Sequence, residues 1–434
     1  MENSHPPIST SPQKKRLLSL DVLRGITVVG MILVNNSGGK LSYDSLQHSA
    51  WNGLTLCDLV FPFFLFIMGV STYIALGKFH FQASGSVVRK VLKRTLVILC
   101  IGWAIHWFHF ICDGDFFPFA HLRLTGVLPR IALCYCVVSF VALYVNHKYI
   151  GWIIGCLIAG YAVLLCIGNG YAPDDTNLLA IIDRNVLGAD HLYHKSPIDP
   201  EGLTSTLSAI AHTLIGFCCG KIILAKEALE QKTLKLFVAG FILMACGFVL
   251  TEALPLNKRI WSPTFVLVTC GLAAMLQSVL IYFIDMKEKK NWCRFFEIFG
   301  VNPLFLYVLS EVAAIVIGAT GSKPVIYEGV HFLITDPYLA SAVYALAFTL
   351  LMGACGYPLY KNIIMMRRTI YTCYSLLLAT VLLPGTISCT SHCGTVDESR
   401  LSYIDTRVGT APSATHTAGL FGRDTEEYGQ TLPA

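Results

Sequence analysis

The 434-residue sequence predicts an all-α fold, a polytopic membrane bundle of about ten transmembrane helices. Hydrophobic residues make up 54% of the chain, only 14% of its residues are charged, and the mean hydropathy is +0.61. Soluble domains carry about 25% charged residues, whereas about 20 consecutive apolar residues are enough to cross a bilayer. The net charge of +5 is small and does not favour nucleic-acid binding. We therefore interpret residues 17–360 as one transmembrane domain.

Each predicted helix is a hydrophobic run bounded by polar residues, and boundaries placed in this way carry errors of about two to four residues. Two glycines four residues apart, Gly216 and Gly220, favour close packing of the sixth run against a neighbouring helix. In chain order, the expected spans are Leu17–Asn35, Leu54–Leu76, Val91–Phe110, Gly126–Val145, Ile150–Gly168, Leu207–Leu224, Leu236–Ala253, Trp261–Ile284, Phe295–Gly318 and Tyr338–Tyr357.

The distribution of Lys and Arg between the connections predicts the orientation of the bundle. If the N-terminus (residues 1–16) is cytoplasmic, the cytoplasmic segments hold 20 Lys and Arg and the opposite connections hold 7. Cytoplasmic connections of membrane proteins carry the excess of these residues. This orientation places the His48 connection and the long polar connection Asn169–Gly202 on the non-cytoplasmic side. The 20 basic residues lie within residues 13–16, 78–94, 148, 221–235, 287–294 and 361–368.

The last 70 residues differ in character from the bundle. Met365–Cys389 has a basic start, an apolar core and a small residue before a cysteine, and so resembles a bacterial lipoprotein signal peptide. The alternative is an eleventh transmembrane helix. Residues 403–434 resemble the opening of a family 92 glycoside hydrolase, through Asp405, Val408, Gly409, Thr410, Gly429, Thr431, Leu432 and Pro433. We expect residues 390–434 to be the truncated start of a neighbouring gene, without the catalytic acids of that family.

Polar residues inside the hydrophobic runs are candidates for function, because burying a charge in a membrane is costly. Asp21 and Arg24 stand three apart on one face of the first run and form either a structural ion pair or part of a site. Asp58 has no obvious partner nearby in the sequence. Together with Arg130, Asn302 and Glu311, these residues suggest a polar cavity across the membrane.

A second group of polar residues lies in the outer connections. His48 is followed by Trp51 and Asn52, and Asn35 ends the first run beside this connection. The long outer connection contains Asp183, Asp190, His191 and Glu201, which either bind a ligand or, in "DPEG", only turn the chain and cap the next helix. We expect His106, His109 and His212 to be structural. We expect no metal site, because Cys134 and Cys136 point to different faces of a helix.

Eight short words between Ser19 and about Tyr307 resemble the transmembrane heparan-α-glucosaminide N-acetyltransferases and their bacterial relatives, and they occur in the order of that family. The most specific is a His-x-x-Trp-Asn-Gly-Leu-Thr word with Asp-x-Val-x-Pro after it. The luminal domain that precedes the membrane region of the animal enzymes has no counterpart here, which leaves the acceptor sugar open. The words are "SLDVLRG", "MILVNNSGGK", "HSAWNGLTLCDLVFPFFLFIMG", "GVLPR", "IIDRNVLGADHLY", "DPEG", "NKRIWS" and "GVNPLFLYV".

The resemblance implies an acetyltransferase of the bacterial inner membrane that takes acetyl from cytoplasmic acetyl-CoA to a glucosamine-type amine on the other side. It also implies that His48 is the active-site histidine and Asn35 its nearby asparagine. His48 would act as general base or carry the acetyl group, and Asn35 would orient His48 or donate to the developing oxyanion. The candidate residues for binding substrate or cofactor are Asp21, Arg24, Asn52, Asp58, Arg130, Asp183, Asp190, His191 and Asn302.

The residues alone leave two other functions open. Buried polar residues would also line the path of a transporter or flippase that does no covalent chemistry, although the chain shows no repeat between its halves. An acyltransferase could instead modify hydroxyls of envelope glycans. The partners expected in each case are a glycan or amino-sugar acceptor and membrane lipid, and homodimer formation stays open.

We predict that a reporter active only outside the cytoplasm will be active when it is fused within the His48 connection or within Asn169–Gly202. The same reporter should be silent within Lys287–Arg294, because that segment belongs to the basic, cytoplasmic set. Reporter activity in colonies expressing each fusion measures the outcome. The opposite pattern would show that the charge asymmetry misleads here.

Overall fold

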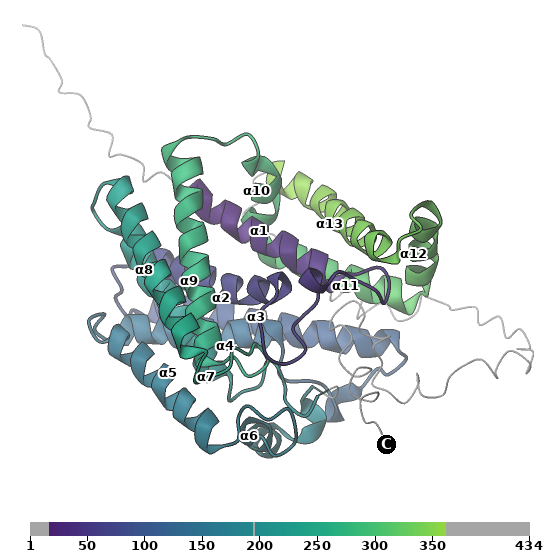
Figure 1. The fold of residues 1–434 in the computed structure, drawn as a ribbon, viewed down its shortest axis with the longest axis horizontal. Helices are drawn as coiled ribbons and strands as arrows, with labels where there is room; N and C mark the ends of the chain where they lie inside the picture. The colour runs from purple at the N-terminus through teal and green to yellow at the C-terminus, as the bar shows by residue number, and fades with distance from the viewer. Residues whose placement is uncertain (1–16, 194–195, 362–434) are drawn as a thin grey trace, which may run out of the picture.

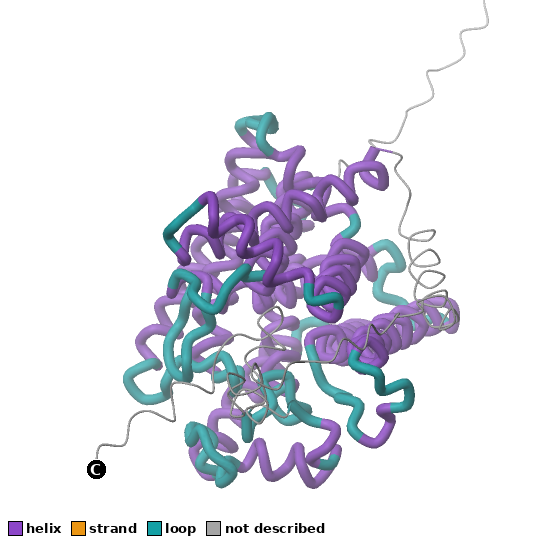
Figure 2. The backbone as a smooth tube through the Cα atoms, turned by 90° about the vertical axis from the view of Figure 1, so that its right-hand side faces the viewer, coloured by secondary structure: helices purple, strands orange, loops and turns teal. Residues whose placement is uncertain are grey.

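A computed structural model describes residues 17–193 and 196–361, and every regular element in those ranges is helical (Figures 1 and 2). The predicted all-α class is therefore confirmed. The interpretations of residues 1–16, 365–389 and 390–434 lie outside the described residues.

The α-helices run through the whole described part, with short 3-10 turns in the connections and a π-helical end on α9. Their bounds are α1 (Leu18–Asn35), α2 (Leu56–Gly77), α3 (Gly85–Cys112), α4 (Val127–Tyr144), α5 (Ile150–Ile167), α6 (Leu178–Leu187), α7 (Thr206–Leu224), α8 (Leu229–Leu250), α9 (Pro263–Leu280), α10 (Cys293–Val301), α11 (Pro303–Ala319), α12 (Ser322–Leu333) and α13 (Pro337–Lys361). The shorter elements are η1 (Asp44–Leu46), η2 (Pro118–Ala120), η3 (Ala189–His191) and η4 (Ile281–Met286).

Nine helices in the described ranges are long and apolar enough to cross a membrane, and α10 with α11 is a bent pair that makes a tenth crossing if it counts as one span. The sequence suggested one continuous span, Phe295–Gly318, and this was wrong. The two helices meet at 82°. The cause lies in Pro303, which lacks an N–H to donate and disfavours a helical conformation in the preceding residue. Asn302 accordingly leaves the helical region, with φ −125° and ψ 58°.

The connections at one end of the bundle contact one another directly. These are the segments after α1, α3, α5 and α8, and the short helix α6, which the sequence interpretation missed, lies in one of them (Figure 1). Because the spans alternate in direction, these segments are the ones expected to share the non-cytoplasmic side. The contacts that join them are Trp51 with Tyr171, Asn52 with Asn257, and Leu124 with His191.

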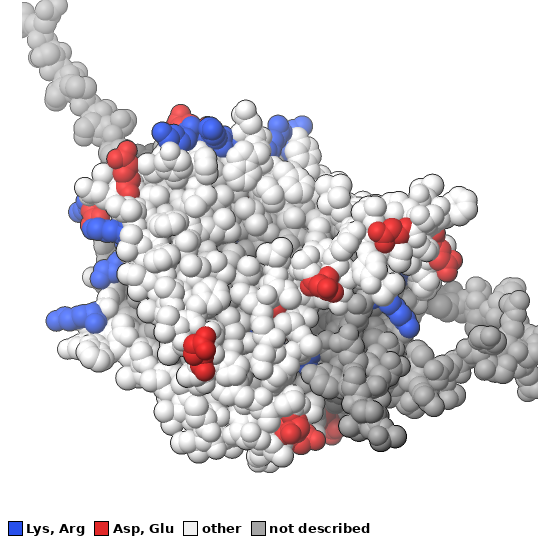
Figure 3. Space-filling view, in the orientation of Figure 1, with Lys and Arg blue, Asp and Glu red and all other residues white. Residues whose placement is uncertain are grey.

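Basic side chains gather at the other end of the molecule. In Figure 3 they lie along the upper and left margins, where Figure 1 shows the connections from α7 to α8 and from α9 to α10. These connections contain several of the lysines and arginines counted above for the cytoplasmic side. The spatial separation of the basic segments from the His48 connection agrees with the predicted alternation of the spans.

Glycine permits a close contact between α2, which follows the His48 connection, and α7. A Cβ atom at Gly216 would lie 2.2 Å from the Phe66 carbonyl oxygen, and one at Gly69 would lie 2.1 Å from the Thr213 carbonyl oxygen. Gly220 similarly faces the side chain of Tyr73. The predicted packing role of Gly216 and Gly220 is therefore confirmed, and the contact holds the helix that follows His48 against the helix that follows Glu201.

We predict that Gly216→Ala will destabilise the protein by about 1–3 kcal/mol, since the new methyl group forces two backbones apart. The matched control is Gly155→Ala on α5, where a Cβ atom meets nothing within 4 Å. Thermal unfolding in detergent micelles measures the difference. Equal unfolding temperatures for the two variants would contradict the close contact between α2 and α7.

Candidate active site

The connection that carries His48 is fastened to the first turn of α2 through Asp58. Thr55 and Asp58 form a capping box, in which the Asp58 carboxylate accepts from the Thr55 backbone N–H at 3.2 Å. The same carboxylate oxygen accepts from the backbone N–H of Ser49 at 3.1 Å. The Thr55 hydroxyl donates to the carbonyl of Gln47 at 2.7 Å. The residues on both sides of His48 are therefore held in place.

The His48 ring contacts the second oxygen of the same carboxylate. Its Nδ1 lies 2.8 Å from Asp58 Oδ1, and 30% of the His48 side chain is exposed while that of Asp58 is fully buried. An ionised carboxylate only accepts hydrogen bonds, so the pair places the ring proton on Nδ1. The Nε2 atom then carries a lone pair that can take a proton or attack a carbonyl carbon. Asp58 thus has partners that its sequence neighbourhood did not reveal.

Two further side chains approach the ring. Lys258, from the connection between α8 and α9, places Nζ at 2.8 Å from His48 Nδ1 and 3.3 Å from Nε2, and at 3.2 Å from Asp58 Oδ1. Cys57 Sγ lies 3.0 Å from Nδ1. The sequence interpretation missed both residues, since Cys57 looked like a small core residue and Lys258 like an ordinary outer-side charge. The word "NKRIWS" was the only signal near Lys258.

The connection that carries Lys258 is tied to the His48 connection by its backbone and side chains. Asn257 donates from Nδ2 to Asn52 Oδ1 at 3.1 Å, and the backbone N–H of Gly53 donates to the Leu256 carbonyl at 2.8 Å. Asn52, a candidate substrate contact in the sequence, is therefore used to join two connections. This contact fixes the distance between Lys258 and His48.

The surroundings of His48 lower its pKa. Burial of the ring nitrogens disfavours the protonated form most, and the Lys258 ammonium adds to this effect, whereas Asp58 and, more weakly, Glu201 act in the opposite direction. The net shift is below the ordinary histidine value of 6.5. His48 is therefore neutral near pH 7, which is the state required of a base or nucleophile.

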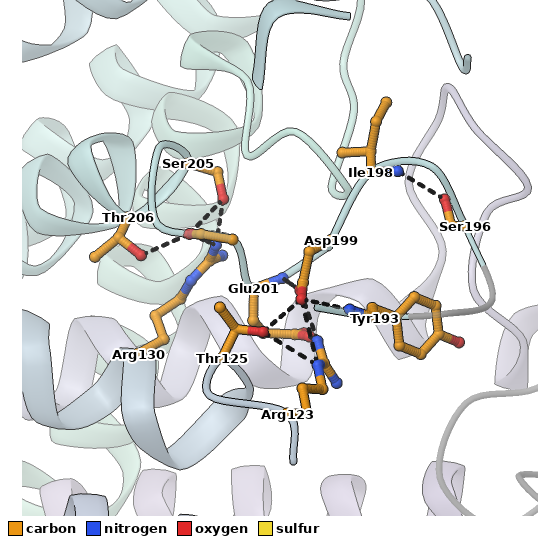
Figure 4. Close-up of polar contacts among 11 residues, drawn as sticks. Arg123, Thr125, Arg130, Tyr193, Ser196, Ile198, Asp199, Glu201, Ser205 and Thr206 are labelled. Atoms are coloured by element: carbon orange, nitrogen blue, oxygen red, sulfur yellow. Dashed lines mark hydrogen bonds and ion pairs between the residues drawn. The ribbon is translucent and has the colours of Figure 1, made fainter. Parts of the chain in front are cut away.

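A second polar cluster is built on Arg123, in the connection between α3 and α4 (Figure 4). Its guanidinium lies 2.6 Å from Asp199 and 2.8 Å from Glu201, and all three residues are buried. Thr125 donates to Asp199 as well. Although burial disfavours a charged guanidinium, the two carboxylates hold the pKa of Arg123 above its ordinary value. Asp199 and Glu201, which belong to the word "DPEG", thus bind the Arg123 guanidinium.

The other candidates from the long outer connection also have partners within the protein. Arg130 donates to the carbonyl of Gly202 at 3.0 Å and to Ser205, and its guanidinium lies 5.1 Å from the Trp261 ring centre. Asp183 accepts from the backbone N–H and hydroxyl of Thr204. His191 Nδ1 contacts the Leu122 carbonyl at 2.8 Å. These contacts support structural roles, while Asp190 is exposed in η3.

Asn35 is placed at the outer end of α1 against α11. The carboxyl of Glu311 interacts with the side chains of Asn35 and Tyr307, and Glu201 acts electrostatically on Tyr307. Asn35 therefore belongs to a polar group with Glu311 and Tyr307. Among the described residues, Glu311 Oε2 has no hydrogen-bond partner.

Asp21, Arg24 and Asn302 lie toward the other end of α1. Arg24 Nη1 donates to Asp21 at 3.1 Å and to the Gly300 carbonyl at 3.1 Å, and Nη2 donates to Ser71 at 2.9 Å. The predicted ion pair is therefore present, and it also joins α1 to α10 and α2. Asn302 is buried at the break between α10 and α11, with its Nδ2 unpartnered among the described residues.

Residues 16–193 match the family model described as heparan-alpha-glucosaminide N-acetyltransferase, catalytic, a range that holds His48, Asp58 and Asn35. The heparan-alpha-glucosaminide N-acetyltransferase of Homo sapiens is 31% identical over 355 residues, which cover 68% of this chain and 53% of the human protein. The Mus musculus protein of the same name is 29% identical over 367 residues, with 71% and 55% covered. The chain belongs to this family.

Membership confirms the resemblance identified in the sequence. The nine long apolar helices of the described ranges and the family membership together make the chain an integral membrane protein. It spans about half the length of the curated relatives that it matches. The family match at residues 16–193 includes Arg123, but Lys258 and Glu201 lie outside it.

We predict that Arg123→Met will destabilise the protein by about 3–5 kcal/mol, because two buried carboxylates lose their cation. The control is Arg184→Met, whose partner Asp175 is 71% exposed and whose loss should cost about 0–1 kcal/mol. Chemical unfolding in detergent, followed by tryptophan fluorescence, measures both variants. If Arg123→Met is as stable as the control, the cluster does not support the outer connections.

Proposed function

We propose that this protein is a transmembrane acetyltransferase that moves acetyl from acetyl-CoA to the amine of a glucosamine-type sugar. The observation that carries the proposal is the His48–Asp58 pair, in which Asp58 binds Nδ1 and leaves Nε2 available. The names of the two relatives give the reaction class, N-acetyl transfer, and a glucosaminide acceptor, and the resemblance identified in the sequence implies acetyl-CoA as the donor. A pair of this kind can activate an amine for attack on a thioester.

The reaction follows from the residue types in either of two ways. In direct transfer, His48 Nε2 takes a proton from the acceptor amine as its nitrogen bonds to the thioester carbon, and the coenzyme thiolate leaves. In the covalent route, Nε2 attacks the thioester carbon first and the thiolate leaves. The acetyl group then passes from Nε2 to the amine, and the released Nε2 takes the proton that the amine loses. Both routes begin with a neutral ring, the state that the environment of His48 favours.

Asn35 is proposed to orient His48 or to donate to the oxyanion that forms on the acetyl carbonyl, an interaction whose loss costs about 10²–10³-fold in comparable sites. Its position beside Glu311 and Tyr307, near Glu201, supports this role. Asp190 and His191, at the outer surface, remain proposed contacts of the acceptor. Asp183 and Arg130 would act by holding the outer connection in shape.

The proposal includes a direction of transfer. With a cytoplasmic N-terminus, as proposed for a bacterial inner membrane, the donor would enter at the basic end of the bundle and the acceptor at the His48 end. Arg24 and Asn35 stand on one helix, eleven residues or about 16 Å apart. Polar groups near both ends of α1 would allow an extended coenzyme arm to carry its thioester toward His48. Asp21, Arg24 and Asn302 would contact this arm.

We predict that His48→Ala will lower acetyl transfer by at least about 10²–10⁴-fold, because neither a base nor a carrier remains. The fold should persist, since a partly exposed loop side chain leaves no core cavity. Purified protein with labelled acetyl-CoA and a panel of amino sugars, in the presence and absence of acceptor, provides the measurement. Cys57→Ala is the matched control, since its thiol also lies beside the ring.

The two routes differ in what happens without acceptor. Label that stays on the wild type and on Cys57→Ala through denaturation, and is absent from His48→Ala, supports an acetyl-histidine. Label that is absent from all three proteins supports direct transfer. Near-normal turnover by His48→Ala would reject the proposed function of this site. A transporter would move sugar without any label reaching it.

A further inference from the structure

We propose that Lys258 is a positioning residue that keeps the His48 ring neutral, with its proton on Nδ1 and its Nε2 free. This inference rests on the proposed function, because it assigns Lys258 a task in the reaction of His48. It starts from three contacts: Lys258 Nζ lies 2.8 Å and 3.3 Å from the two ring nitrogens and 3.2 Å from Asp58 Oδ1.

The pair of distances from Lys258 to the ring defines how the ammonium approaches. The lone pairs of an imidazole lie in the ring plane and point away from each other. A donor aligned with the in-plane direction of Nδ1 would therefore stand far from Nε2. Since Nζ is nearly as close to Nε2 as to Nδ1, the ammonium stands over the face of the ring. The in-plane direction of Nδ1 is left to Asp58, at 2.8 Å.

Asp58 binds both neighbours at once through Oδ1. It accepts from Nδ1 and forms an ion pair with Lys258, so one carboxylate oxygen holds both the ring and the lysine. An ammonium over the ring repels a second positive charge there. The neutral ring with Nδ1–H toward Asp58 is the form that satisfies all three residues.

Lys258 is largely buried, and the connection that carries it is fixed by hydrogen bonds, unlike that of a typical surface lysine. Its side chain is 14% exposed. The neighbouring Asn257 is tied by Nδ2 to Asn52, four residues after His48, and Asn257 Oδ1 accepts from the backbone N–H of Ile260 at 3.2 Å. The ammonium is therefore delivered to the ring by a connection whose own conformation is fixed.

The charged groups that face His48 come from three elements. Asp58 is on α2, Glu201 precedes α7, and Lys258 lies between α8 and α9, while Cys57 contributes a neutral thiol. Two of the three charges are negative and favour an imidazolium. Lys258 is the cation among these groups that opposes them. Without it, burial alone opposes the two carboxylates, so the pKa of His48 is higher than in the wild type and the ring becomes protonated at a higher pH.

The effect on the reaction is a shift of the pH at which the site works. A protonated ring has no lone pair on Nε2 and can neither accept the amine proton nor attack the thioester. After direct transfer, the new imidazolium stands next to the ammonium, so its proton is released readily to water. Lys258 would thus favour both the start and the end of the cycle.

The test measures the protonation of His48 without acetyl transfer. Diethyl pyrocarbonate modifies the neutral imidazole, so the extent of modification of the His48 peptide against pH, read by mass spectrometry, gives a titration midpoint. Lys258→Met should raise this midpoint by about one pH unit, which corresponds to about tenfold less neutral ring on the acidic side. Lys258→Arg should restore the wild-type midpoint, because it retains the cation.

Lys40→Met is the control, since Lys40 is an exposed lysine in the same connection as His48. It should leave the midpoint unchanged. Lys258→Gln serves as a second neutral variant if Lys258→Met does not fold. Wild-type midpoints in the neutral variants, or equal shifts in Lys258→Arg and Lys258→Gln, would overturn the inference.

The kinetic profile gives an independent reading. In the neutral variants, the acidic limb of kcat/KM should move to higher pH, with rates close to wild type above that limb. A uniform loss at every pH would assign Lys258 a merely structural role and overturn the inference. Normal turnover by His48→Ala would reject the proposed function separately. The two outcomes can be told apart because the titration midpoint of His48 is measured without acetyl transfer.

Discussion

The buried carboxylate of Asp58 is the interaction on which the outer end of the bundle depends. One oxygen accepts from the backbone of Ser49 and Thr55, which starts α2 and closes the preceding connection. The other meets His48 and Lys258. A buried charge without such donors would be strongly destabilising, so the carboxylate requires all of them. The first turn of α2, the His48 connection and the Lys258 connection are therefore one cooperative unit.

Helix packing brings this unit to the Arg123 cluster. The glycines on α2 and α7 let the two helices approach until backbone atoms nearly touch, and α7 begins just after the segment that carries Asp199 and Glu201. Glu201 then interacts with Arg123 directly and with His48 at longer range. The rigid contact between helices thus sets the electrostatic environment of a histidine that neither helix contains. This coupling explains why so many outer residues are buried and paired although they lie in connections.

Hydropathy was enough to predict the class, the alternation of the spans and the side on which His48 lies relative to the basic segments. The family words led to His48 and Asn35, and the cost of burying a charge in a membrane led to Asp58. Neither approach could predict that Lys258, 210 residues from His48, reaches its ring, because such a contact is set by the fold and leaves no local pattern. The break between α10 and α11 was a different kind of error. Asn302–Pro303 carried a recognisable local signal, and the long apolar run obscured it.

That break determines the polar contacts at both levels of α1. A helix that ran on past Asn302 would use the Gly300 carbonyl for its own hydrogen bonding, yet here this carbonyl accepts from Arg24. The 82° turn then directs α11 across the outer half of α1, where Glu311 reaches Asn35. Pro303 thus positions the Arg24 guanidinium toward one end of α1 and the Asn35 amide at the other end. Since irregular backbone at membrane depth is tolerated only where it is buried in protein or lines a cavity, the position of this break beside the polar residues of α1 favours a functional reason for it.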